Sequence, residues 1–405
     1  MMLQARVTTV GVIGCGTAGA AAALLLSRGG CKVTVFERVA DPMPVGAGII
    51  VQPSGQAVLA RLGLLEGIVA KGARLDRLFL RTPRGKTIVD LHYASVDPRW
   101  FGIGIHRGVL FEALYEAARA EVTVKTGCAV RGLRRDGART FVRADEEHGP
   151  FDLIVIADGA VSELRTGTGK TTRDRAYPWG ALWFVAEDRQ AVFTRELHQV
   201  AAGAQRLYGV LPTGLAPRGD VPVISLFWSL AAHELEAWRA GGLDAWKAEV
   251  RAIDPRIAFV LDGIRSHEQV VFARYRDVQM ARWHDGPIVF IGDAAHATSP
   301  QLGQGANLAL VDACVLADAI ARARSVEAGL VSYAAARRQH LRHYQTMARL
   351  LTPFFQSDSR VLGRLRDWVF PIANALPPLR NFMVSTMAGM SRGFGREHLA
   401  LPPTP

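Results

Sequence analysis

The chain has 405 residues, 49% of them apolar and 21% charged, which indicates a folded protein of two or three domains and excludes a disordered or fibrous one. Its net charge of +11 is concentrated from Arg337 onward, where ten arginines outnumber three acidic residues, but no nucleic-acid-binding motif accompanies it, so no nucleic-acid partner is expected. The four cysteines are too widely spaced for a zinc site; with no secretory signal, they predict reduced thiols, no metal and a cytoplasmic protein.

The first predicted elements are a strand, a helix and a second strand. Thr8–Ile13 has the pattern of a buried strand, Ala18–Ser27 that of a helix, and Lys32–Phe36 that of a strand. Because glycines interrupt the apolar window, a βαβ unit explains it better than a membrane span or a signal peptide.

The turn between the first strand and the helix is Gly14-Cys15-Gly16-Thr17-Ala18-Gly19, the spacing of a dinucleotide-binding turn. Glycines allow the chain to turn sharply, a pyrophosphate to approach the backbone, and the helix to pack closely on the strand. The free N–H groups at the helix N-terminus then attract phosphate. Glu37 follows 18 residues after Gly19, where a carboxylate can accept hydrogen bonds from an adenosine ribose.

Two later strands also run into turns that carry an acidic residue. Asp152–Ile156 leads to Asp158-Gly159, and Pro287–Ile291 leads to Gly292-Asp293. A carboxylate at the end of a strand can bind a polyol. The second turn continues to Gly303–Asn307, a glycine-rich turn that opens a helix and can bind an electron-rich ring edge through its N–H groups.

The sequence between these motifs has a different character. The segments Tyr177–Val185, Gln205–Leu211 and Val221–Trp228 are rich in aromatic and β-branched residues, which predicts a more antiparallel sheet. After it, helices are predicted over Ala306–Ala323 and Glu327–Leu351, and prolines at 353, 371 and 377–378 are predicted to break the helical pattern.

The three motifs, in this order, resemble the FAD-dependent aromatic hydroxylases related to p-hydroxybenzoate hydroxylase, a group of flavoprotein monooxygenases. The resemblance extends over about residues 5 to 350. It implies that FAD is the cofactor, that NADPH or NADH is a transient reductant, and that O₂ hydroxylates a small aromatic or phenolic substrate through a flavin C4a-hydroperoxide.

The resemblance also implies where the cofactor binds. Arg107 matches the arginine near the cofactor's phosphates and ribityl chain, and Gly46-Ala47-Gly48-Ile49 matches the loop beside the flavin. The predicted cofactor-binding residues are Gly14, Gly16, Thr17, Ala18, Gly19, Glu37, Arg38, Gly48, Arg107, Asp158, Asp293, Pro300, Gly303, Gly305, Ala306 and Asn307.

Catalytic and substrate-binding residues follow from proximity to these motifs. His106, Gln52 and His296 are the candidates for catalysis, with a loop-stabilising hydrogen bond as the alternative for each histidine. The predicted pocket is formed by Trp183, Tyr208, Trp228 and Pro300, although the aromatic residues can equally be core of the inserted sheet.

The expected fold is α/β: a Rossmann-like FAD-binding domain, an inserted mixed or antiparallel substrate domain, and a C-terminal helical region. The expected boundaries are residues 1–75, 100–175 and 280–325 for the first, 76–99 and 176–279 for the second, and 326–405 for the third.

Residues 353–394 mix aromatic residues with arginines, as in a helix that lies on a membrane surface; a tail packed on the substrate domain or on a dimer partner is the alternative. Two other functions remain open. One is an FAD-dependent reductase or dehydrogenase acting on a prenyl or other apolar substrate. The other is a flavin-free escort module, which the intact Gly292-Asp293 motif disfavours.

Overall fold

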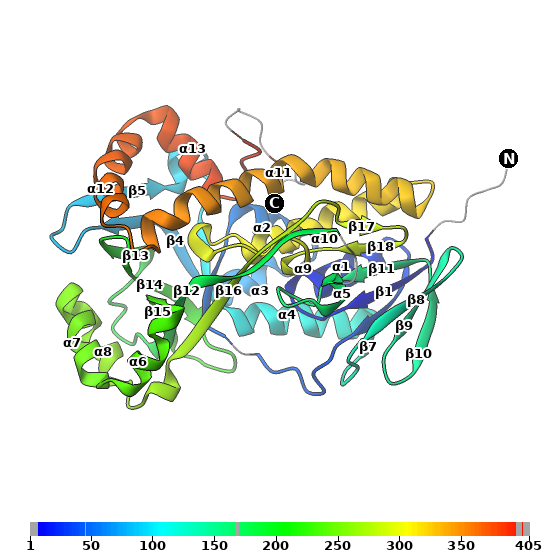
Figure 1. Cartoon of the computed structure of the whole chain (residues 1–405), viewed down its shortest axis with the longest axis horizontal. Helices are drawn as coiled ribbons and strands as arrows, with labels where there is room; N and C mark the ends of the chain where they lie inside the picture. The colour runs from blue at the N-terminus through cyan, green and yellow to red at the C-terminus, as the bar shows by residue number, and fades with distance from the viewer. Residues whose placement is uncertain (1–6, 45, 167–169, 394–398, 400–405) are drawn as a thin grey trace.

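The computed structural model describes residues 7–44, 46–166, 170–393 and 399, so the remaining parts of the expected domains lie outside the described residues. A six-stranded sheet forms one half of the molecule (Figure 1). In sheet order its strands are β17 (His284–Asp285), β18 (Ile288–Phe290), β11 (Leu153–Ile156), β1 (Thr9–Ile13), β2 (Lys32–Phe36) and β7 (Thr123–Lys125). The strands from β18 to β7 are parallel, and β17 pairs antiparallel with β18 at the edge.

Both faces of this sheet are covered, which explains why its central strands are apolar throughout. Alternate residues such as Val10, Val12 and Val155 pack under the helices α1 (Thr17–Arg28), α4 (Arg107–Glu121) and α10 (Gly305–Arg322). The other residues, including Ile154 and Ile156, pack against a three-stranded antiparallel sheet of β8 (Gly132–Asp136), β9 (Arg139–Arg143) and β10 (Glu147–Phe151).

A nine-stranded, mainly antiparallel sheet forms the other half. In sheet order the strands are β16 (Val271–Met280), β12 (Thr171–Glu187), β15 (Pro222–Ala231), β14 (Arg206–Leu215), β13 (Arg195–Ala202), β4 (Ala73–Arg81), β6 (Gly102–His106) and β3 (Gly48–Val51), with β5 (Thr87–His92) paired to β4. The strands β3 and β6 come from segments that the sequence assigned to the cofactor domain, and β12 begins inside that domain's expected range, so the large sheet includes parts of that expected domain.

The two faces of the large sheet have different neighbours. On what we call the outer face, Leu182, Tyr208 and Trp228 pack with the helices α6 (Leu235–Ala240), α7 (Leu243–Ile253) and α8 (Ala258–Asp262). On the opposite, inner face, Ser225 Oγ accepts a hydrogen bond from the N–H of Gly48 in β3 at 2.8 Å, so β15 meets the end strand of the same sheet there. The shorter helices of the cofactor half are α2 (Pro53–Arg61), α3 (Leu65–Lys71), α5 (Glu163–Thr166) and α9 (Asp293–His296).

Three helices end the described chain: α11 (Val326–Phe355), α12 (Arg360–Ala375) and α13 (Pro377–Met387). The predicted break at Pro353 was wrong, since α11 continues to Phe355, where the lost hydrogen bond falls in the last turn. The break at Pro371 was also wrong. Because proline has no N–H, the backbone carbonyl of Asp367, four residues before Pro371, loses its helical hydrogen bond. Lys86 Nζ donates a hydrogen bond to this carbonyl at 2.7 Å instead.

A buried ionic network joins α9, α10 and α11. The Asp312 carboxylate accepts hydrogen bonds from His296 Nε2 at 2.5 Å, Arg337 Nε at 2.7 Å and the Gly292 N–H at 2.8 Å. Arg337 also contacts His340 Nδ1 at 2.6 Å, and His340 Nε2 contacts the Gly389 carbonyl at 3.0 Å. The positive partners hold the pKa of Asp312 well below its usual range against full burial. The network thus ties the Gly292-Asp293 turn to the C-terminal helices.

We expect stability to fall in mild acid because two buried histidines of α11 stay neutral in the folded state. Burial lowers the pKa of His343 to about 4, and burial beside Arg337 lowers that of His340. Unfolded histidines titrate near pH 6.5, so below that pH the unfolded state binds more protons than the folded state and is stabilised relative to it. For His343 alone the loss between pH 7.5 and 5 is about 2 kcal/mol.

Urea denaturation at pH 7.5, 6 and 5 measures this loss, and His343→Gln reduces it. The control is His233→Gln, which changes an exposed histidine. An unfolding free energy that stays constant over this pH range contradicts the expectation.

Candidate functional site

The three glycines of the first turn meet three different demands. Gly14 has φ +93°, and a Cβ there would lie 2.5 Å from the Ala157 carbonyl oxygen. A Cβ on Gly19 would overlap the Gly14 carbonyl oxygen, whereas one on Gly16 would meet nothing within 4 Å. The first and third glycines therefore allow the turn and the close helix packing, and Gly16 leaves open space at the N-terminus of α1, where no side chain caps the helix.

Glu37 closes the same turn from the end of β2. Its carboxylate accepts hydrogen bonds from the Cys15 N–H at 2.9 Å and from the Val39 N–H at 3.0 Å. The side chain is half-buried, so it is held in place and still reaches solvent. Burial, with the charge of Glu37, raises the pKa of the Cys15 thiol to about 12, which keeps this cysteine protonated.

The second and third motifs meet the first at one edge of the parallel sheet. β11, β1 and β18 are neighbours, and the carboxyl ends of parallel strands share an edge, the usual ligand site of such sheets. A Cβ on Gly292 would lie 2.9 Å from Ala18 Cβ, so the third motif touches α1. Asp293 Oδ1 lies 4.0 Å from the Cβ position of Gly305. Three stretches that are distant in sequence thus converge.

Asp158 is held on one oxygen and unpaired on the other. Asp158 Oδ2 accepts from Ser162 Oγ at 2.8 Å, while Oδ1 is buried without a partner, and burial raises the pKa of the carboxyl. A buried acceptor without a donor is costly, so a ligand that donates here is favoured. The open space at Gly16 and this unpaired carboxylate fit a dinucleotide cofactor along the edge.

The loop from Gly46 to Gly48 lies against the start of α4. A Cβ on Gly46, which has φ +127°, would lie 3.2 Å from Arg107 Cβ, and the Arg107 N–H donates to the Ala47 carbonyl at 3.0 Å. The Arg107 side chain is exposed. Gly48 faces the large sheet instead, because a Cβ there would overlap Thr213. The glycine at position 48 is therefore explained by close packing between β3 and β14 within the large sheet.

Asn307 clamps α10 to the β3–α2 segment. Its Oδ1 accepts from the Gln52 N–H at 2.8 Å, and its Nδ2 donates to the carbonyls of Ile50 at 2.9 Å and Gly303 at 3.2 Å. The side chain is fully buried and its polar atoms are used by the backbone. Any effect of Asn307 on a cofactor therefore acts through the shape of the Gly303 turn, where Gly303 has φ +61°.

The remaining predicted cofactor residues lie around the same edge. Thr17 and Ala18 begin α1, Ala306 is in the first turn of α10, and Arg38 is exposed beside Glu37. Pro300 is exposed at the start of a 3-10 turn, Pro300–Leu302.

Each of the three catalytic candidates is held by a hydrogen bond to its surroundings. His106 Nδ1 accepts the Gly108 N–H at 3.1 Å, and burial lowers the pKa of this imidazole, so its one acceptor nitrogen is already used. His296 is buried on Asp312. The Gln52 amide cannot accept a proton, and its Oε1 accepts a hydrogen bond from the Tyr93 hydroxyl at 2.6 Å. These side chains hold the loops in place, which was the alternative for each histidine.

The pocket aromatics divide between the two faces of the large sheet. Tyr208 and Trp228 pair across strands and are buried on the outer face under α7 and α8, which corrects their placement in the pocket. Trp183 pairs with Phe227 on the inner face, with ring centroids 5.2 Å apart. Tyr275 joins them, since its hydroxyl lies 3.3 Å from Trp183 Nε1. Phe227 and Tyr275 share this face but were not among the predicted pocket residues, because strand alternation gives faces only once the register is known.

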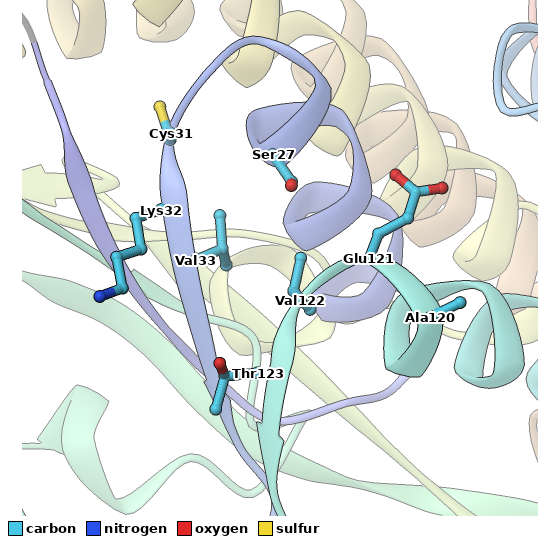
Figure 2. A pocket seen from close by; sticks show the side chains of 8 residues that line it. All are labelled: Ser27, Cys31, Lys32, Val33, Ala120, Glu121, Val122 and Thr123. Atoms are coloured by element: carbon cyan, nitrogen blue, oxygen red, sulfur yellow. The ribbon is translucent and has the colours of Figure 1, made fainter.

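The surface hollow in Figure 2 does not belong to this site. It is lined by Ser27, Cys31, Lys32, Val33, Ala120, Glu121, Val122 and Thr123. These residues lie where β2 and β7 begin and where α1 and α4 end. The hollow is therefore at the amino end of the parallel strands, opposite the edge where the motifs converge. In the part of the chain that the structure describes, no cluster of three side chains could hold a metal ion.

Comparison with known proteins matches residues 7–348 to a family described as FAD binding domain. The chain is 29% identical to 6-methylpretetramide 4-monooxygenase of Streptomyces rimosus, over 93% of this chain and 91% of that one. It is also 29% identical to the FAD-dependent urate hydroxylase of Klebsiella pneumoniae, over 84% and 88% of the two chains.

Solved structures share the fold. The structure of Klebsiella pneumoniae HpxO complexed with FAD and uric acid superposes with a TM-score of 0.78 at 22% identity, covering 94% of this chain and 97% of that one. P. aeruginosa PqsL in complex with 2-aminobenzoylacetate gives a TM-score of 0.78 at 22% identity, covering 89% and 100%.

Gly16→Val separates cofactor binding from folding. The Gly16 Cβ position is open, so we expect near-normal stability, but the side chain would occupy the space where phosphates approach and weaken FAD binding at least about tenfold. Gly19→Ala should instead destabilise the fold by about 1–3 kcal/mol, because its Cβ overlaps Gly14. Flavin titration and thermal unfolding without FAD measure the two effects. If Gly16→Val binds FAD with wild-type affinity, the placement of the FAD phosphates beside Gly16 is refuted.

Proposed function

Because this chain belongs to the FAD-binding domain family of flavoprotein monooxygenases, we propose that it uses NADH or NADPH and O₂ to hydroxylate a small aromatic or phenolic substrate. The observation that carries the proposal is the family match over residues 7–348 together with the convergence of all three motifs at one sheet edge. We expect it to act in the cytoplasm, with a homodimer as a possible assembly.

The chain's own residues would hold FAD along this edge. The N-terminal N–H groups of α1 beside Gly16 would bind the phosphates, Glu37 the adenosine ribose, and Asp293 the ribityl chain. The N–H groups of the Gly303 turn would stabilise negative charge on the ring edge. When bound, FAD supplies electron transfer from the nicotinamide and the activation of O₂.

The inner face of the large sheet would bind the substrate. Trp183, Phe227 and Tyr275 present aromatic surface, and burial raises the pKa of the Tyr275 hydroxyl to about 12, so it remains a hydrogen-bond donor. Ile50 and Phe227 pack against the same apolar cluster of Leu75, Leu197 and Leu211, and the Ile50 carbonyl accepts a hydrogen bond from Asn307 Nδ2. Apolar side chains at this place would keep water from the reacting atoms.

A reductase or dehydrogenase on the same scaffold is the alternative, and it requires no O₂. The relatives from Streptomyces rimosus and Klebsiella pneumoniae carry monooxygenase and hydroxylase names, which favours oxygenation. A flavin-free escort protein is disfavoured by the complete set of cofactor motifs.

The first test is flavin binding and substrate-stimulated oxidation of NADH or NADPH. We expect a yellow protein whose nicotinamide oxidation consumes O₂ and rises severalfold with the correct substrate. A suitable panel contrasts a compact polar ring, uric acid, with 4-quinolones that carry a 2-heptyl chain. A protein that stays colourless with FAD contradicts the proposal, and turnover that needs no O₂ supports the reductase instead.

Phe227→Ala tests the assignment of the inner face. The smaller side chain opens the pocket to water, so we expect about a tenfold loss in kcat/KM and less product per nicotinamide oxidised. Trp228→Phe is the matched control, because the neighbouring residue lies on the outer face and should lower stability without changing this ratio. Loss of coupling in Trp228→Phe but not in Phe227→Ala would reverse the assignment.

A further inference from the structure

Helix α12 is attached to the protein through its polar and small residues. A Cβ on Gly363 would lie 2.8 Å from the backbone of Gly203 and Ala204, so the helix packs there at close range. The buried Arg366 guanidinium donates to the Gly203 carbonyl at 2.8 Å and to the Phe354 carbonyl at 2.9 Å. Near the end of α12, Asn374 Oδ1 accepts a hydrogen bond from the Asp90 N–H at 3.3 Å.

The opposite side of α12 is apolar and exposed. At spacings of three and four residues, Val361 is 71% exposed, Leu365 45%, Trp368 73%, Ile372 59% and Leu376 48%. Such spacing places these side chains on one side of the helix. We call Val361, Leu365, Trp368, Ile372 and Leu376 the outer apolar stripe. In Figure 1, α12 lies at one extremity of the molecule, beside β5 and α13. A water-facing stripe of this kind indicates a surface that is covered in use.

Basic side chains border the outer apolar stripe. Arg360 and Arg364 are exposed on the same helix, and Lys86 Nζ lies 5.8 Å from the centroid of the Trp368 ring. Arg84 is exposed in the same β4–β5 turn as Lys86. The nearby Asp367 is paired with Arg366 at 2.7 Å, which leaves Asp358 as an exposed acid at the start of this segment. The border is therefore positive overall, as is the chain, with a net charge of +11.

We propose that α12 lies in the surface of an anionic membrane, with the outer apolar stripe in the acyl boundary and the basic side chains on the lipid headgroups. Charge favours an anionic membrane over a second copy of the chain as the partner that covers the outer apolar stripe. Two chains of +11 would bring like charges together, whereas anionic lipids attract them. The contact is interfacial: among the residues that the structure describes, no helix is long and apolar enough to span a bilayer.

The position of α12 gives this docking a consequence for the substrate, which rests on the proposed function. Phe370 on the attached side of α12 contacts Phe355, with ring centroids 6.0 Å apart. Both rings belong to an apolar cluster that also includes Phe227 of the inner face. Apolar side chains thus connect the membrane-facing helix with the proposed pocket, which suits an apolar aromatic substrate dissolved in the bilayer.

Co-sedimentation of the FAD-loaded, full-length protein with vesicles tests the docking. We expect the wild type to sediment with phosphatidylglycerol vesicles, at least about tenfold more weakly with phosphatidylcholine, and less in high salt. Trp368→Ser combined with Ile372→Ser should weaken binding at least about tenfold. Val331→Ser combined with Val69→Ser is the matched control, since these exposed apolar residues lie on α11 and α3, and it should bind like the wild type.

The outcomes separate docking from the catalytic proposal. Sedimentation needs no turnover, so a protein that binds vesicles without oxidising nicotinamide refutes only the function. Wild-type protein that stays in the supernatant with anionic vesicles overturns the docking, as does a stripe variant that binds like the wild type. Analytical ultracentrifugation without lipid completes the test: a dimer that the stripe variant abolishes would assign this surface to a second copy.

Discussion

The close backbone contact between the three motifs is the constraint on which the site depends. Gly14 packs its backbone against Ala157, and Gly292 packs against Ala18, so neither glycine can carry a side chain without displacing a neighbour. These contacts bring the ends of β1, β11 and β18 to within reach of one elongated ligand. The unpaired oxygen of Asp158 and the open space at Gly16 then lie along the same edge.

The cofactor half and the substrate half are joined by backbone as much as by side chains. β3 and β6 follow the cofactor loops in sequence but pair within the large sheet, and Asn307 of α10 makes two hydrogen bonds at the end of β3, with the Ile50 carbonyl and the Gln52 N–H. The distance between the cofactor proposed on the Gly303 turn and the substrate proposed on the inner face would therefore be set by a rigid connection. Such rigidity suits chemistry that depends on position and on the exclusion of water.

The C-terminal helices add a second level of organisation. The network of His296, Asp312 and Arg337 anchors α11 under the Gly292-Asp293 turn, so the helices are tied to the cofactor half. From that anchored position α12 carries its apolar side outward. Within the segment 353–394, the apolar side of α12 faces away from the protein, whereas Val384 and Met387 of α13 are buried.

The sequence alone determined the βαβ start, the order of the three motifs and the presence of an inserted sheet, because glycine spacing and apolar periodicity are local properties of the chain. It could not separate Phe227 from Trp228, since adjacent strand residues face opposite ways and only strand register says which of them lies on the inner face. It could not foresee that His106 caps a helix or that His296 is buried on Asp312, because those partners are set by long-range contacts. Nor could it place Pro371 within a helix, where Lys86 supplies a donor to the carbonyl that proline leaves unpaired. Local pattern therefore decided which elements and motifs exist, and tertiary packing decided what each side chain faces.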